Sequence, residues 1–276
     1  MTKIKKKSLP SSLIVTQSNQ LVEARYNLPL SEQRLILTMI SRIQPDDEDF
    51  KPYRISVSEL AEFLGVDKGS AYRECKKTTE NLLKRVVCIE EPTGLLQVGW
   101  VSSAKYIDGL GVVDLSFDPL LKPYLLKIKG NFTSSKLSML LSFKSQYTYR
   151  IYSLLKQYQN LKEREIELDL LRGILGIGKE QYNEYKNFKS RILQPTCSEL
   201  AEKADVYFEF DEIKVGRKVS AIKFNIITKK PTKTLSDIQD KPEALVHKLS
   251  NAINYCPKAT VPENYHDQSV RIKRHS

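Results

Sequence analysis

The residues between 182 and 191 have side-chain types and a spacing that suit base recognition in DNA. A helix here, with ~3.6 residues per turn, would bury Tyr185, Phe188 and Ile192 on one side and turn a polar face outward. Asn pairs with the edge of adenine, and Arg and Lys pair with guanine or phosphate, so this face suits the major groove. An ordinary solvent-exposed face is the alternative. The candidate contact residues are Tyr182, Asn183, Lys186, Asn187, Lys189, Ser190 and Arg191.

A second helix, expected over residues 70–85, offers a basic face. Arg73, Lys76 and Lys77 would point outward from it, and Lys68 lies in the turn before it. This face holds few side chains that recognise bases, so it suits phosphate contacts. Basic helix faces are common, and one without a ligand explains the pattern equally well.

A basic hairpin tip is expected at residues 214–218, with Gly216 in its turn. Arg217 and Lys218 could reach phosphates or a minor groove from this tip. A solvated hairpin that binds nothing is the alternative.

The sequence gathers no credible catalytic or metal-binding set. Histidines at positions 247, 266 and 275 form no His-x-His pair, and no Ser/His/Asp set stands out. Residues 173–179 resemble a phosphate-binding loop, but Glu180 stands where Ser or Thr must hold magnesium. The cysteines lack CxxC spacing and are interpreted as free thiols in a reducing cytoplasm. We therefore expect no enzymatic activity, no cofactor and no metal. The cysteines are Cys75, Cys88, Cys197 and Cys256.

The charge balance favours a polyanionic partner. Among 276 residues, 44 are Lys or Arg and 33 are Asp or Glu, which gives a formal net charge of +11. Nucleic acid is the usual partner of such a surplus, although a merely basic soluble protein would show it too. No segment approaches the ~20 apolar residues that span a membrane, and the N-terminus lacks the apolar core of a signal peptide. We expect a cytoplasmic protein without membrane contact.

An internal repeat indicates which elements position these side chains. Residues 60–68 recur 111 positions later as 171–179, and residues 72–76 recur 110 positions later as 182–186. Each copy follows a strand-like piece, has the pattern helix, Gly-containing turn, helix, and precedes further strands. Two related helix-turn-helix units are predicted, each with its own wing. In the first unit the two strands directly after the second helix are expected to form that wing.

Hydrophobic periodicity and turn residues predict the other elements. Ser56 and Glu59 have the spacing of a capping box for a helix that ends at Gly65. Two helices within residues 134–159 should pack between the halves of the chain, since the second carries a stripe of Tyr and Leu. The remaining segments are a helix at 31–43 and strands at 53–57, 86–90, 95–106, 112–117, 165–168, 206–210 and 219–227.

These elements predict an α+β chain with two pseudo-symmetric winged-helix domains and a flexible C-terminal tail. A basic arm at residues 1–12 precedes a first domain at 13–131, which would make phosphate contacts. The second domain, at 132–230, would carry the main DNA recognition. Scattered prolines and charges suggest that residues 231–276 are largely irregular, with one short helix near 242–253.

Three separated motifs stand out: QLVEARY at 20–26 with LSEQR at 30–34, then SQYTYRIYSLL at 145–155, then YKNFKSRIL at 185–193 continuing through EL at 199–200, GRKV at 216–219 and IKF at 222–224. Together these motifs resemble the family of iteron-binding plasmid replication initiators. They occur in the order of the family and together cover roughly residues 13–227, so the resemblance is specific.

The resemblance implies that a helix at 182–193 makes most base contacts, with Lys186, Lys189 and Arg191 foremost. Monomers would bind direct repeats in a plasmid origin, help to open adjacent AT-rich DNA and recruit the host replication initiator and helicase. In equilibrium with them, homodimers joined through the first domain would bind an inverted operator repeat and repress the protein's own gene.

Two other functions remain open. A dedicated transcriptional repressor would use the same DNA-binding elements, mainly as a dimer on an inverted repeat. An interaction scaffold would bind protein through its winged helices, since a fold does not fix a function. Such a scaffold should show little salt-dependent affinity for DNA.

Overall fold

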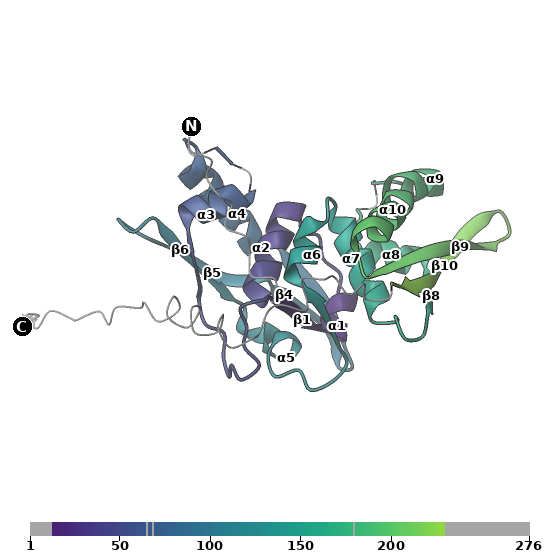
Figure 1. Cartoon of the computed structure of the whole chain (residues 1–276), viewed down its shortest axis with the longest axis horizontal. Helices are drawn as coiled ribbons and strands as arrows, with labels where there is room; N and C mark the ends of the chain where they lie inside the picture. Colours follow the sequence, from purple (N-terminus) through teal and green to yellow (C-terminus); the bar gives the residue numbers. More distant parts are fainter. Residues whose placement is uncertain (1–12, 65, 68, 179, 230–276) are drawn as a thin grey trace, which may run out of the picture. The chain divides into compact units, whose positions relative to one another are not determined.

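A computed structural model describes residues 13–64, 66, 67, 69–178 and 180–229 (Figure 1). The basic arm at 1–12 and the tail at 231–276 lie outside these residues, as do the short helix expected near 242–253 and Gly65. Within the described residues the chain is α+β and contains two modules. Both have the order strand, helix, helix, strand, strand once a hairpin inserted after the second helix of the first module is set aside.

The first module is a winged helix with a three-stranded antiparallel sheet. Its strands lie in the order β2-β6-β5, so the last strand in sequence pairs with both others. The predicted capping box is confirmed: the Ser56 hydroxyl accepts from the N–H of Glu59 at 3.1 Å, and the Glu59 carboxylate accepts from the N–H of Ser56 at 3.2 Å. The elements are β2 (Tyr53–Ser56), α3 (Val57–Leu64), α4 (Ala71–Leu83), β5 (Val101–Ile107) and β6 (Val112–Phe117).

The second module repeats this topology, with strands in the order β8-β10-β9. The predicted pair of pseudo-symmetric winged helices is thereby confirmed. After α8 the chain forms one long helical stretch in three consecutive parts. The elements are β8 (Glu163–Glu167), α8 (Leu168–Ile174), α9 (Tyr185–Phe188), the π-helical turn η2 (Lys189–Leu193), α10 (Gln194–Lys203), β9 (Val206–Val215) and β10 (Lys218–Thr228).

Relative to the repeated residues, the second helix begins later in the second module than in the first. Tyr182 matches Tyr72 of α4 in sequence, but it lies in the turn with a φ of +50°, and the helical stretch begins at Tyr185. The guanidinium of Arg172 donates to the carbonyl oxygens of Gln181 at 2.6 Å and Tyr182 at 2.8 Å, which folds this turn against α8. The expected helix at 182–193 is therefore wrong at both ends, because the helical stretch runs on to Lys203.

The wing of the first module is the hairpin of β5 and β6, because β6 pairs with β2 just as β10 pairs with β8. The expectation that the strands directly after α4 form the wing is wrong. Those strands, β3 (Val86–Glu91) and β4 (Gly94–Gly99), make a separate two-stranded sheet. Val87 and Ile89 bury this hairpin in the core, and Cys88 exchanges two backbone hydrogen bonds of 2.9 Å with Arg25.

The remaining elements join both ends of the first module. Strands β1 and β7 pair antiparallel. Residues 132–136 therefore form a strand, although a helix was expected to begin at residue 134. The expected tyrosine stripe is confirmed as core, since Tyr149 and Tyr152 of α7 are buried. These elements are β1 (Ile14–Ser18), α1 (Asn19–Glu23), α2 (Leu30–Ile40), η1 (Pro119–Leu121), α5 (Lys122–Leu125), β7 (Phe132–Lys136), α6 (Leu137–Ser142) and α7 (Gln146–Lys156).

Candidate nucleic-acid interface

The helical stretch of the second module turns the expected polar face to solvent. Phe188 and Ile192 are buried, and Tyr185 is half-buried beneath the same side. This arrangement confirms the predicted inward side of the helix. The side chains exposed on the other side are those of Lys186, Asn187, Ser190 and Arg191.

A turn of π-helix interrupts the middle of this stretch. Pro195 has no N–H to donate to the preceding turn, and the N–H of Gln194 reaches back five residues to the carbonyl of Lys189. The wider turn lets Ile192 and Leu193 both point into the core, where they are 1% and 0% exposed. Arg191 consequently stays on the solvent side beside them.

The two basic residues flanking the face have different surroundings. Lys189 is held by the wing strand β9, with its Nζ 2.7 Å from Oε1 of Glu212 and 5.7 Å from the centre of the Phe210 ring. The hydrogen bond from Lys189 holds the pKa of the Glu212 carboxyl below its usual value. Arg191, like Lys186, makes no side-chain hydrogen bond or ion pair within the described part of the chain. Both cations are therefore available to an external anion or base.

The wing of the second module ends in the expected basic tip. Gly216 turns the chain with a φ of +63°, a conformation that suits glycine, and Lys218 pairs with Val215 across the turn. Arg217 and Lys218 are exposed there, and Val215 is 72% exposed. Figure 1 shows this hairpin extending from the module on the side where α9 lies.

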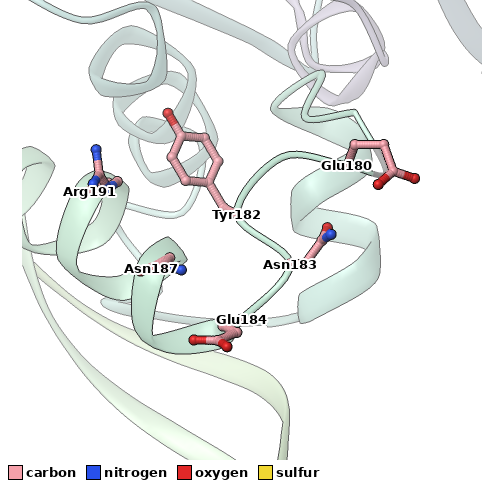
Figure 2. Close-up of a pocket in the computed structure, with 6 residues that line it drawn as sticks. All are labelled: Glu180, Tyr182, Asn183, Glu184, Asn187 and Arg191. Carbon is pink, nitrogen blue, oxygen red and sulfur yellow. The ribbon is translucent and has the colours of Figure 1, made fainter.

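The turn before α9 adds an open depression of about 400 Å³ beside the helix (Figure 2). Tyr182 is half-buried, with its ring 6.3 Å from that of Tyr147 in an edge-on contact, whereas Asn183 is exposed. Reasoning from the sequence missed the two carboxylates at this site, Glu180 and Glu184, because it searched for positive charge. The lining residues are Glu180, Tyr182, Asn183, Glu184, Asn187 and Arg191.

The first-module candidates lie together on α4, apart from Lys68, which is outside the described residues. Arg73, Lys76 and Lys77 are exposed as expected, although Arg73 has its Nε 3.2 Å from a carboxylate oxygen of Glu74. Tyr72 is also exposed on this helix and packs edge-on against Tyr106 of the wing at 5.3 Å. The face is basic with an aromatic edge, which the charge pattern alone did not indicate.

The glycine-rich run, the acidic and sulfur-containing side chains and the helix lengths bear on activities other than DNA binding. Residues 173–178 form the end of α8 and the turn after it, as expected from the mismatch at Glu180. In the described ranges no cluster of three His, Cys, Asp or Glu side chains could hold a metal. No helix among those residues is long and apolar enough to cross a membrane. Cys75, Cys88 and Cys197 are free thiols, and Cys256 lies in the undescribed tail.

Comparison with known proteins identifies the family. Residues 14–156 match the family model described as "Initiator Replication protein, WH1", and residues 167–226 match the one described as "Initiator Rep protein, WH2". The first match includes β7, α6 and α7, and the second contains the candidate helix and wing.

Individual relatives agree with these matches. A replication initiation protein of Escherichia coli is 28% identical over 227 residues, covering 78% of this chain and 70% of that protein. The PI protein of Escherichia coli is 23% identical over 253 residues, covering 77% and 82%. The fold is that of the Pi initiator protein in its crystal structure with iteron DNA, with a TM-score of 0.62, 21% identity, and coverage of 80% of this chain and 100% of that one. Because the first family match alone covers more than half of the sequence, the chain belongs to the family of initiator replication proteins with WH1 and WH2 domains.

Proposed function

We propose that this protein initiates plasmid replication by binding iterons, the direct repeats of an origin. The observation that carries the proposal is the solvent-exposed face of α9 and η2, where Lys186 and Arg191 have no partner within the described residues. A helix with such a face fits the major groove, where Arg pairs with guanine and Asn with adenine. The Pi initiator, which has this fold, was crystallised with iteron DNA.

The two modules would divide the contacts. The basic tip at Arg217 and Lys218 would follow the backbone or the minor groove next to the helix. Lys76 and Lys77 on α4 would bind phosphates of the same site, which adds affinity without choosing a sequence. Of the helix candidates, Lys189 would contribute least, because Glu212 neutralises it.

Membership of the initiator family supports a proposal for the finer functions as well. The protein would help to open AT-rich DNA beside the repeats and recruit the host initiator and helicase. As a dimer joined through the first domain, it would bind an inverted repeat and repress its own gene. All of this would take place in the bacterial cytoplasm, on the plasmid.

A DNase footprint on the DNA flanking the protein's own gene tests the proposal. We expect evenly spaced protection over tandem direct repeats, in phase with the helical turn. Protection of one inverted repeat alone would identify a dedicated repressor instead. Absence of protection at moderate salt would overturn DNA binding altogether and favour an interaction scaffold.

A further inference from the structure

The depression beside α9 carries negative charge in a protein with a net charge of +11. Glu180 and Glu184 both line it and are both exposed. A carboxylate facing DNA repels phosphates and weakens binding to every sequence, unless it meets a hydrogen-bond donor. In the major groove the base-edge donors are the amino groups of cytosine N4 and adenine N6.

Glu184 is the carboxylate placed to meet such a donor. Its carbonyl accepts the N–H groups of Asn187 at 3.0 Å and Phe188 at 3.2 Å, which fixes the residue at the start of the helix. Its side chain makes no hydrogen bond or ion pair with any described residue. Figure 2 shows Glu184 at the beginning of the helix, followed by Asn187 and then Arg191 around the same depression.

The hydrogen-bonding capacity of a carboxylate selects among the bases. An ionised Glu only accepts hydrogen bonds, so guanine, with O6 and N7 as acceptors, and thymine, with O4, would repel it. Adenine offers one donor, but its N7 acceptor lies beside that donor and would face the second carboxylate oxygen. Cytosine offers the N4 donor with no neighbouring acceptor on its own edge.

We infer that Glu184 is a specificity-determining residue that accepts a hydrogen bond from the N4 amino group of a cytosine in the repeat. Asn187 and Arg191 recognise adjacent base pairs. The inference rests on the proposed function, since it requires this helix to enter a major groove. Glu184 lowers affinity for random DNA and restores affinity where cytosine occupies the matching position.

The Glu184→Gln substitution gives the sharpest test. A Gln side chain both donates and accepts, which matches the paired N6 donor and N7 acceptor of adenine. The variant should therefore prefer adenine where the wild type prefers cytosine, with a change in discrimination of roughly fivefold to a hundredfold. Loss of one negative charge should also tighten its binding to random DNA.

The experiment selects binding sites from a randomised duplex pool with the full-length chain. Glu202→Gln is the matched control, because this substitution removes the same charge from an exposed residue of α10 that lies outside the depression. We expect the wild type and Glu202→Gln to enrich one motif, and Glu184→Gln to enrich that motif with cytosine replaced by adenine at one position.

The outcomes separate the inference from the function. An identical motif for Glu184→Gln and the wild type would overturn the role of Glu184 and leave the proposed function standing. A wild type that enriches no motif would overturn the proposed function itself. As a second variant, Glu184→Ala should lose the cytosine preference without gaining one for adenine. Retained cytosine preference in that variant would also refute the inference.

Discussion

Gly176 shows how one residue can be required by close packing. It follows α8 with a φ of +66°, and a Cβ atom placed there would lie 2.3 Å from the carbonyl oxygen of Tyr26 and 2.8 Å from its carbonyl carbon. The side chain of Asn27 donates to the Gly176 carbonyl at 3.1 Å from the same segment. Gly176, one glycine of the run that resembles a nucleotide-binding loop, is thus explained by a backbone contact with the segment before α2.

Gly176→Ala should lower the free energy of unfolding more than the same change at a turn that packs against nothing. Gly216 has a similar φ of +63° with nothing within 4 Å of its missing Cβ, so Gly216→Ala should cost only the conformational strain, about 1–2 kcal/mol. Gly176→Ala must also displace backbone atoms, and we expect a loss of about 3 kcal/mol or more. Urea denaturation measures both. Equal losses of unfolding free energy would show that the backbone of Tyr26 moves aside at little cost.

Arg191 and Lys189 are equivalent in sequence, since both flank the polar face, but the structure separates them. Arg191→Ala should lower affinity for the target by about 1–3 kcal/mol, because a free guanidinium is available to a base. Lys189→Ala should lower the stability of the fold by about 0.5–1 kcal/mol through loss of the Glu212 pair, with a smaller effect on discrimination. Titration of both variants with target and random DNA distinguishes these results. Unchanged discrimination in Arg191→Ala would contradict its assignment.

Among the helices and strands, features that depend on neighbouring residues were predicted from the sequence more successfully than features that depend on contacts between distant segments. The capping box at Ser56 and the repeated strand and helix before each turn depend on neighbouring residues, and both appear in the structure. The wing of the first module depends on β2 pairing with β6, across the inserted hairpin of β3 and β4. The start of α9 depends on Arg172 holding the turn. No periodicity encodes either contact, which is why both predictions failed.

Glu199 joins α10 to the beginning of α7 and so fixes the candidate helix in its module. Its carboxylate accepts the backbone N–H of Lys144 and the hydroxyl of Thr148, both at 2.8 Å, and lies 2.7 Å from Nζ of Lys203. Burial raises the pKa of this carboxyl, but the hydrogen bonds from Lys203, Thr148 and Lys144 outweigh burial and hold the pKa below its usual 4.5. The charged form therefore stabilises the folded state.

Glu199→Gln should remove this stabilisation in a pH-dependent way. A carboxyl with a depressed pKa contributes stability above its unfolded pKa, and that contribution is lost as pH falls through the folded pKa. At pH 7 we expect the variant to be about 2 kcal/mol less stable than the wild type, a typical value for hydrogen bonds to a charged group. The difference should shrink below pH 4.5. Denaturation measured from about pH 3 to about pH 7, across the range in which carboxylates titrate, measures this difference. A difference that stays constant over the range would rule out the charge as the cause.

For the whole molecule, Arg150 is a buried link between the two winged-helix domains. It lies on α7, within the WH1 match, and is 2% exposed. Its guanidinium donates to the carbonyl of Ile174 at the end of α8 at 2.9 Å, donates to the carbonyl of Ala24, and lies 3.8 Å from the centre of the Tyr26 ring. The Tyr26 ring in turn packs edge-on against Trp100 at 5.0 Å. One side chain thus connects the core of the first domain to the helix-turn-helix of the second.

Arg150→Met tests whether this link makes the two domains unfold together. Met keeps much of the apolar volume but leaves the carbonyls of Ala24 and Ile174 without a donor, so we expect a loss of about 2–5 kcal/mol. Because the lost contacts join the two domains, heat unfolding followed by calorimetry should split into two transitions. Arg85→Met is the control: it breaks the 2.6 Å ion pair with Glu32 inside the first domain, and it should lower the temperature of the single transition without dividing it. If Arg150→Met lowers the temperature of a single undivided transition, other contacts couple the domains and Arg150 acts only on their common stability.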